Sequence, residues 1–252
     1  MGRETPWEDE YTLLCERCGY VVEGLDPAGN CPECGKPIAE SLPERRVGTA
    51  WQRSPSLGSA ALTGIQTLLT PISTLNRMQP EVGLPKRRLL SKYALLAALG
   101  VPIPPLVGAF IAMTVYGAGD WGIAGQFLAM VLVMGGLIAA AVTFTAVFIL
   151  TSIESRGLRF IASRRNFRLT PAHAVAITSH AGIGWVLAFP SASAAVVGMI
   201  FSLAIAGVDS IAVVLIGSAG FLAGFLFFET FAWLGLRRCK FANRARPPAE
   251  RS

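Results

Sequence analysis

The stretch WGIAGQFLAMVLVMGGLIAAAVTFTAVFIL, residues 121–150, contains no charged side chain in thirty positions. A helix needs about 20 consecutive apolar residues to cross a bilayer, so this stretch predicts a membrane-spanning segment. Three further apolar runs accompany it, at residues 93–116, 172–207 and 210–236. Together the four runs predict an all-α polytopic membrane helix bundle over residues 93–236.

The composition agrees with a chain of which one part lies in water and another in lipid. Of its 252 residues 52% are hydrophobic and only 15% are charged, whereas a soluble domain carries about 25% charged residues. The basic side chains lie in the segments that flank the apolar runs, as they do in membrane proteins. The net charge of +6 is therefore interpreted as a topology signal before a nucleic-acid signal.

The number of spans stays open between four and five. Pro102, Pro104 and Pro105 must bend the run at 93–116. The run at 172–207 would extend roughly 54 Å as one helix, well beyond a hydrocarbon core of about 30 Å. It is either one broken span or two short ones, and the sequence Phe189-Pro190-Ser191 is the expected break.

Positive charge predicts which ends face the cytoplasm. Lys and Arg are dense in residues 151–171 and in a basic tail at 237–252, and absent from the connections 117–120 and 208–209. An even number of spans places both basic regions on the cytoplasmic side. Residues 1–10 have no apolar core typical of a signal peptide, so the N-terminus is expected in the cytoplasm too.

Four of the five cysteines form a metal-binding pattern. Cys15-x-x-Cys18-Gly19 and Cys31-x-x-Cys34-Gly35 are separated by twelve residues. Each pair can present two thiolates to one ion, and four thiolates make a closed tetrahedral site with no position for water. We predict a zinc ribbon over residues 1–40 that binds one structural Zn²⁺ through Cys15, Cys18, Cys31 and Cys34. An iron or redox site is the alternative.

The residues between the two cysteine pairs predict a short β-hairpin. Tyr20-Val21-Val22 has the composition of a strand, and residues 26–30, DPAGN, have the composition of a turn. A segment of about thirty residues cannot bury a sufficient core, so the metal is expected to supply folding energy.

The ribbon is joined to the membrane domain by two segments. Residues 41–55 contain few apolar side chains and predict a linker. Residues 56–92 begin with apolar residues at three- and four-residue steps, which predicts an amphipathic helix that Pro71 kinks or interrupts. This helix lies either in the membrane interface or on the protein's own cytoplasmic face. Residues 151–170 are either a second surface helix or a basic loop.

Three stretches together resemble the Yip-type membrane family, the Ypt/Rab-interacting proteins. They are residues 71–78, PISTLNRM, before the first span; the compact apolar segments with short connections; and residues 168–173, RLTPAH, leading into Thr178–Trp185. The resemblance covers roughly residues 56–236. It implies five spans and a role in vesicle trafficking or membrane shaping, whereas the basic tail departs from a layout that ends outside.

No enzyme motif is present, and we expect a non-catalytic protein. His180 and Glu229 lie inside apolar runs, at nearly the same depth if both runs start on the cytoplasmic side. An unpaired intramembrane charge is costly, so we predict that Glu229 meets His180, Thr178 or Ser179. The alternative is a Glu229 that is protonated or reaches the cytoplasmic surface.

Three functions are compatible with these features. The first is a membrane scaffold or adaptor whose ribbon binds a cytoplasmic protein, and the second is a small transporter or channel that uses His180 and Glu229. The third, a nucleic-acid binder, is disfavoured because the ribbon carries Glu16, Glu23, Asp26 and Glu33. The lipid bilayer is an expected partner, and the glycine-rich runs suit a homo-oligomer or a compact monomer equally.

Overall fold

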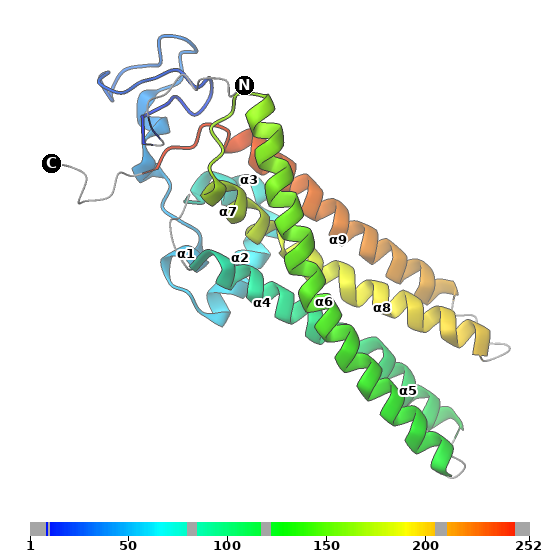
Figure 1. Ribbon diagram of the computed structural model, residues 1–252. Helices are drawn as coiled ribbons and strands as arrows, with labels where there is room; N and C mark the ends of the chain where they lie inside the picture. The colour runs from blue at the N-terminus through cyan, green and yellow to red at the C-terminus, as the bar shows by residue number, and fades with distance from the viewer. Residues whose placement is uncertain (1–8, 10, 80–84, 117–121, 205–210, 245–252) are drawn as a thin grey trace. The chain divides into compact units, whose positions relative to one another are not determined.

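A computed structural model describes residues 9, 11–79, 85–116, 122–204 and 211–244, and these residues are mainly helical (Figure 1). The long helices are α4 (Pro85–Gly100), α5 (Ile103–Tyr116), α6 (Gly122–Arg164), α8 (Ile183–Ala204) and α9 (Ile211–Arg238). The shorter ones are η1 (Ile38–Ser41), η2 (Pro43–Arg45), α1 (Ala50–Arg53), α2 (Leu57–Leu69), α3 (Pro71–Arg77) and α7 (Pro171–Ala181).

Four helical segments in the described part of the chain are long and apolar enough to cross a membrane. They are Leu89–Phe110, Val133–Arg164, Ile183–Ile200 and Ile211–Arg238. This agrees with the predicted class, a multi-span helical membrane protein, and with the lower of the two span numbers.

The chain forms two compact units. Unit 1 comprises Met1–Leu89, Thr151–Ala181 and Thr230–Ser252, and unit 2 comprises Leu90–Leu150 and Gly182–Glu229. Each unit is therefore assembled from segments that are far apart in the sequence.

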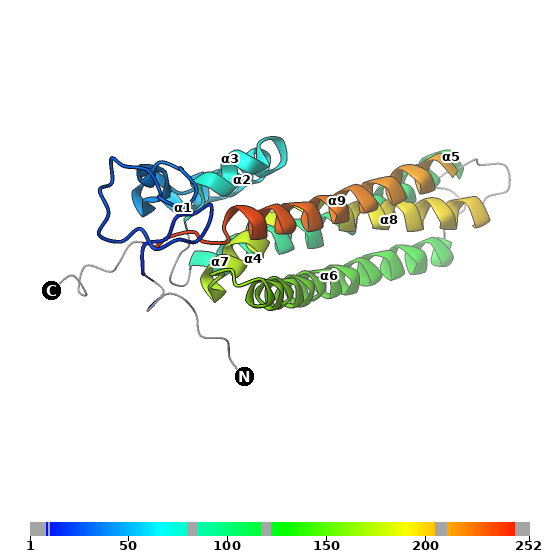
Figure 2. The same ribbon diagram turned by 90° about the horizontal axis from the view of Figure 1, so that it is seen from above.

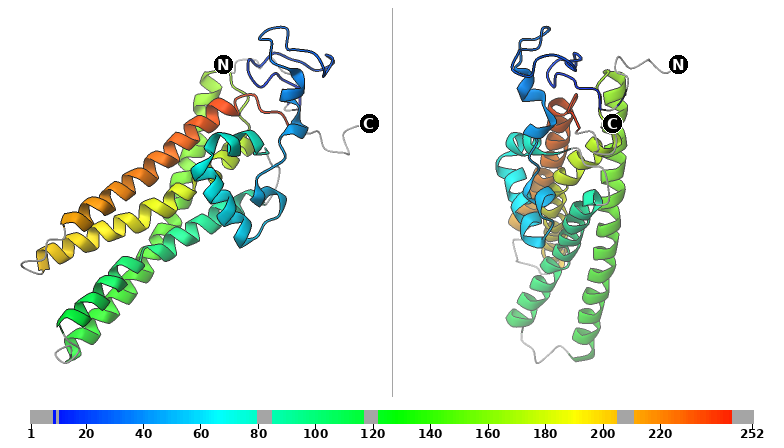
Figure 3. Two further views of the ribbon diagram at one scale, coloured as in Figure 1. Left: turned by 180° about the vertical axis from the view of Figure 1, so that it is seen from behind. Right: turned by 90° about the vertical axis from the view of Figure 1, so that its left-hand side faces the viewer.

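Unit 2 is built on close approaches between helices through glycine. A Cβ added at Gly184 would lie 2.5 Å from the carbonyl oxygen of Gly224, and one added at Gly217 would lie 2.6 Å from that of Ser191. These contacts pack α8 on α9, which run side by side in both views of Figure 3. The glycines of residues 217–224 thus serve packing within the chain, as small residues do between membrane helices.

The break predicted at Phe189-Pro190-Ser191 is wrong. Pro190 lies inside α8, and the helix is interrupted instead at Gly182, between α7 and α8. A Cβ at Gly100 would lie 2.5 Å from Cγ of Pro190, and the Ser193 hydroxyl donates to the Val101 carbonyl at 2.7 Å. The Pro190 ring therefore occupies space that a side chain at position 100 would fill, and α8 stays continuous around it. A contact between residues so far apart in the sequence cannot be predicted from the residues next to Pro190.

Two other expectations concern helix continuity. The bend expected from Pro102, Pro104 and Pro105 is confirmed, since α4 ends at Gly100 and α5 begins at Ile103.

Residues 151–170 are neither a separate surface helix nor a loop over most of their length. Instead α6 continues unbroken to Arg164, giving 43 residues and a length of roughly 65 Å. Arg156, Arg159 and Arg164 therefore lie in the C-terminal part of a helix that contains a candidate span.

Unit 1 gathers the short helices, and α2 contacts α1, α3 and α7. Figure 2 shows α2 and α3 lying together. The sequence explains the starts of these helices: Thr49 with Gln52 and Ser56 with Ser59 form capping boxes at α1 and α2. Pro71 occupies the first turn of α3, so the predicted interruption there is confirmed. Residues 41–55, expected to be a linker, instead contain η2 and α1.

Helix α2 buries its small and polar face and exposes its large apolar side chains. Ala60, Thr63 and Thr67 are buried, and the Thr63 hydroxyl accepts a hydrogen bond from the backbone N–H of Trp51 at 2.9 Å. In contrast, Leu57 is 72% and Leu69 is 77% exposed. The apolar face of α2 does not pack on the protein. This fits a helix that lies in the membrane interface better than one that packs on the protein's own cytoplasmic face.

Candidate metal centre

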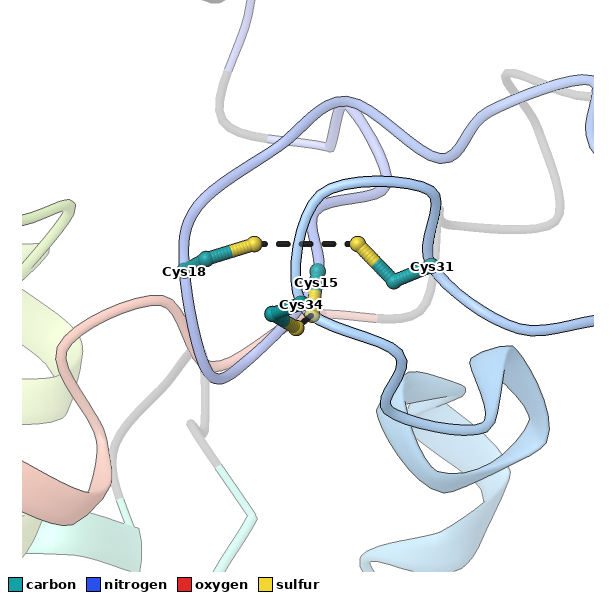
Figure 4. A group of neighbouring side chains, drawn as sticks. All are labelled: Cys15, Cys18, Cys31 and Cys34. Atoms are coloured by element: carbon teal, nitrogen blue, oxygen red, sulfur yellow. Dashed lines mark hydrogen bonds between the residues drawn. The ribbon is translucent and has the colours of Figure 1, made fainter.

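The four cysteines predicted as metal ligands come together in one cluster, which Figure 4 shows at the meeting of two loops. Their four sulfur atoms all lie within 4.8 Å of one another, and the closest pairs are Cys15–Cys34 at 3.5 Å and Cys18–Cys31 at 3.6 Å. A disulfide would require about 2.05 Å. Tetrahedral coordination with Zn–S bonds of about 2.3 Å places sulfurs about 3.8 Å apart, so the spacing fits a metal ion.

The two loops that carry the cysteines are local repeats of the same backbone structure. In the first, the Cys15 N–H donates to the Tyr20 carbonyl at 2.8 Å, and the Gly19 N–H donates to the Cys15 carbonyl at 2.9 Å. In the second, Cys31 and Gly35 make the equivalent bonds, both at 2.8 Å. Gly19 and Gly35 have φ of +83° and +70°, which is why glycine follows each second cysteine.

The environment separates the pKa values of the thiols. Burial raises the pKa of Cys15, but the backbone N–H groups of Cys18 and Arg17 and the neighbouring thiols lower it more, to about 7. Burial and the neighbouring thiols raise the pKa of Cys18 to about 12, and burial raises the pKa of Cys34 as well. Without metal, the first thiolate forms at Cys15, and a bound cation must displace protons from other thiols.

Between the cysteine loops the secondary structure is sparser than predicted. The strand expected at Tyr20-Val21-Val22 is reduced to isolated antiparallel bridges, Leu14 to Val21 and Asn30 to Pro37. The expected turn is present, with the Gly29 N–H donating to the Asp26 carbonyl at 2.9 Å. A small hydrophobic core of Cys15, Val22, Cys31 and Ile38 is buried around the cluster. So small a core supports the expectation that a metal contributes to folding.

The first cysteine loop is held within unit 1 by a residue that follows α9. The Asn243 side chain accepts from the Leu14 N–H at 2.9 Å and donates to the Leu14 carbonyl at 2.7 Å and the Ser41 carbonyl at 2.6 Å. Arg168, which is 4% exposed, donates to the Asn243 amide oxygen and to the Thr12 carbonyl. This network holds three distant parts of the chain together.

A second anchor is the ion pair of Arg46 with Glu16. The Arg46 Nε and Nη2 donate to the two Glu16 carboxylate oxygens at 2.9 and 3.1 Å, and Nη1 donates to the Leu75 and Met78 carbonyls. Arg46 is 4% exposed and lies in the segment expected to be a linker. Glu16 directly follows Cys15, so Arg46 links the metal centre to the end of α3 through these hydrogen bonds.

A third anchor comes from the segment expected to be a basic cytoplasmic tail. The Phe241 ring lies under Gly19, where an added Cβ would approach its Cζ to 2.7 Å. Cys239 is fully buried beside Arg46, and burial raises the pKa of its thiol. Residues 239 and 241–244 are thus part of the support of the metal centre, so Gly19 is required here for space as well as for its φ.

Sequence reasoning missed these anchors, although one signal was present. Arg46, Arg168 and Asn243 look like surface residues, because nothing nearby in the sequence indicates burial. The apolar Phe241, two residues after Cys239 in a basic tail, however, is a pattern that favours docking over exposure.

His180 is buried within unit 1 and both of its ring nitrogens have partners there. Nδ1 lies 2.8 Å from the Ala176 carbonyl, so it carries the proton, and Nε2 accepts from the Thr49 hydroxyl at 3.2 Å. Burial lowers the pKa of His180 to about 4, which makes the ring neutral. Glu229 belongs to unit 2, and its pairing with His180 stays a prediction.

The sequence matches no protein-family model, and no curated protein or solved structure is similar to it. The described residues themselves define a class: a helical protein with four segments able to cross a membrane and a four-cysteine centre suited to a metal ion. The resemblance to the Yip-type family stays an expectation from the sequence.

Proposed function

We propose that this protein is a non-catalytic membrane scaffold or adaptor whose four-cysteine centre is a structural zinc ribbon that binds a cytoplasmic protein. The observation that carries the proposal is the donor set of the cluster. Four sulfur ligands complete the tetrahedral coordination of Zn²⁺, so the bound ion would have no open position for a substrate or a reactive water. Such a site stabilises a surface and does not perform chemistry.

The ribbon offers a surface suited to a protein partner. Tyr20, Val21 and Leu25 are large apolar residues that are 44%, 39% and 40% exposed. Two exposed acidic residues, Glu23 and Asp26, lie in the same loop. Aromatic and apolar side chains bordered by charge are typical of protein-binding surfaces. The acidic character favours a basic partner and opposes binding to nucleic acid.

The anchoring of the ribbon supports an adaptor role. Asn243, Arg46 and Phe241 hold the cysteine loops within unit 1, so the ribbon is not a module on a free tether. Binding to a fixed surface costs less conformational entropy than binding to a mobile segment, which must become ordered. A role in membrane organisation or trafficking is proposed from the resemblance to the Yip-type family.

Two measurements test this proposal on the full-length protein. Elemental analysis after purification without chelators should find one zinc per chain, and Cys18→Ser should remove it. Photo-crosslinking in native membranes should capture a partner through residue 25, and the purified partner should bind the purified wild type directly. Tyr20→Ser/Leu25→Ser should abolish that binding with zinc retained, whereas Glu44→Ser, at an exposed site in η2, should not. Equal binding by all variants would refute the assignment of this surface.

A further inference from the structure

Unit 1 contains a strongly cationic cavity of about 850 Å³ beside the metal centre. Eight of its fourteen lining residues are Arg or Lys, and two are Glu. The cations come from four parts of the fold: the cysteine loops, the segment 45–46, the end of α3 and the end of α9. The basic residues at the end of α9 therefore converge with others that are distant in the sequence.

Most of these cations form no ion pair with the acidic residues that the structure describes. One carboxylate, that of Glu16, is bound by the buried Arg46. Among the residues that the structure describes, no ion pair joins Arg45, Arg77 or Arg237 to an acidic group. All three are exposed on the cavity wall. Like charges held around one cavity repel each other, so an anion there would relieve the repulsion.

We propose that this cavity binds a phosphate-bearing anionic ligand. Guanidinium groups bind phosphate oxygens in pairs of parallel hydrogen bonds, and most of the cations here are arginines. Lysine side chains at positions 36 and 240 add single charges on the same wall. The volume falls within the range of small-ligand sites and would hold a phosphorylated headgroup with its glycerol.

The position of the cavity favours an anionic lipid as the source of the phosphate. Arg237 and Arg238 end the candidate span Ile211–Arg238, and Leu234 lines the cavity one turn earlier. When α9 crosses a bilayer, this turn lies at the level of the headgroups, where anionic lipids concentrate around basic side chains. Leu42, Val47 and Leu234 provide apolar wall at which an acyl chain can leave. A free phosphate compound presents the same chemistry without the chain.

The binding test uses full-length protein in nanodiscs and two probes. Phosphatidylglycerol is titrated into phosphatidylcholine nanodiscs, and inorganic phosphate is titrated against protein in phosphatidylcholine alone. Arg77→Gln/Arg237→Gln removes two charges from the cavity, whereas Arg53→Gln/Arg164→Gln removes two exposed charges of unit 1 outside it. Zinc content and elution volume verify that each variant is folded.

We expect saturable binding of one phosphatidylglycerol per chain. Two basic side chains near an anionic headgroup contribute about thirtyfold in affinity, so the cavity variant should weaken binding by about that factor. The control pair acts only through a screened field and should change binding by about twofold or less. Arg77→Lys/Arg237→Lys should restore part of the affinity, because it returns charge without the paired hydrogen bonds.

The outcomes separate the two sources and can overturn the site. Tight, saturable binding of phosphatidylglycerol with weak binding of inorganic phosphate supports a lipid, and the converse supports a soluble phosphate compound. Equal losses in the cavity and control variants would show that net charge alone attracts the probes, and the site would be refuted. Absence of saturable binding of either probe would refute it as well. Neither result would affect the zinc content on which the proposed ribbon depends.

Discussion

Asn243 pairs with Leu14 as a strand residue pairs with its neighbour: its amide binds both the N–H and the carbonyl of that residue, at 2.9 and 2.7 Å. The two residues are 229 positions apart. One side chain therefore satisfies both backbone groups of a fully buried leucine next to the first metal ligand.

Replacing Asn243 by leucine should loosen the metal centre. The change leaves the buried N–H and carbonyl of Leu14 without partners, at a cost of about 1–3 kcal/mol for each group. We expect zinc to transfer to a chelator at least tenfold faster, as followed with a chromogenic chelator. Asn76→Ala, at an exposed asparagine of α3, is the control and should transfer zinc at the wild-type rate. Equal rates for Asn243→Leu and wild type would show that the pairing does not support the site.

Zinc binding should release protons, and more of them at lower pH. The pKa of Cys15 is about 7, whereas the pKa values of Cys18 and Cys34 are raised, so the latter two thiols hold their protons at neutral pH. Below pH 7 Cys15 is protonated as well and adds a further proton. Zinc affinity should therefore fall as the pH decreases. Calorimetry in buffers with different ionisation enthalpies counts the protons, and a count near zero at pH 6 would contradict thiol ligation.

Acidification should destabilise unit 1 through His180. Its pKa is about 4 in the fold and 6.5 when the chain is unfolded, so the unfolded state binds a proton that the folded state excludes. Neutral His180 makes its full contribution to the free energy of unfolding above pH 6.5. This contribution, about 3 kcal/mol in total, is lost as the pH falls towards 4. His180→Gln should flatten this part of the profile of unfolding free energy against pH. A profile unchanged by the substitution would mean that other groups cause the acid sensitivity.

Both ends of the chain should face the cytoplasm. Four candidate spans, found in the described part of the chain, would return it to its starting side, and the basic residues after α9 favour the cytoplasmic side. A reporter that is active only outside should be silent after Arg246 and active when inserted in the connection at residues 117–120. Activity after Arg246 would instead support a five-span layout like that implied by the Yip-type resemblance.

Glu229→Gln should distinguish a scaffold from a transporter. The substitution removes a carboxylate that can exchange a proton within α9 but keeps a similar volume. A scaffold should keep its partner binding and show no change in proton flux when reconstituted in liposomes. Proton flux in the wild type that disappears in the variant would favour the transporter hypothesis and a role for the predicted pairing with His180.

The sequence was sufficient where the relevant interactions are local. The four cysteines were identified because each pair and its glycine lie within five residues, and the apolar runs were identified because a bilayer imposes a length on every span. The kink sites at Pro71 and Pro102 were found for the same reason, since proline acts on its own backbone.

The sequence was insufficient where distant residues decide the local structure. Pro190 looked like a break, but the space at Gly100 lets it remain inside α8. The segments 41–55 and 237–252 looked like a linker and a tail, since the partners that bury Arg46 and Phe241 are found elsewhere in the chain. Burial of a polar residue depends on the group that pairs with it, and hydropathy contains no information about that group.

The pairing of Leu14 with Asn243 has a consequence for biosynthesis. A ribosome delivers the cysteine loops first, yet the residue that completes their support is added 229 positions later. In between, every candidate span must be synthesised. The metal centre thus gains its last contacts only after α9 has been synthesised, so stable retention of the metal requires a chain that is complete through Asn243.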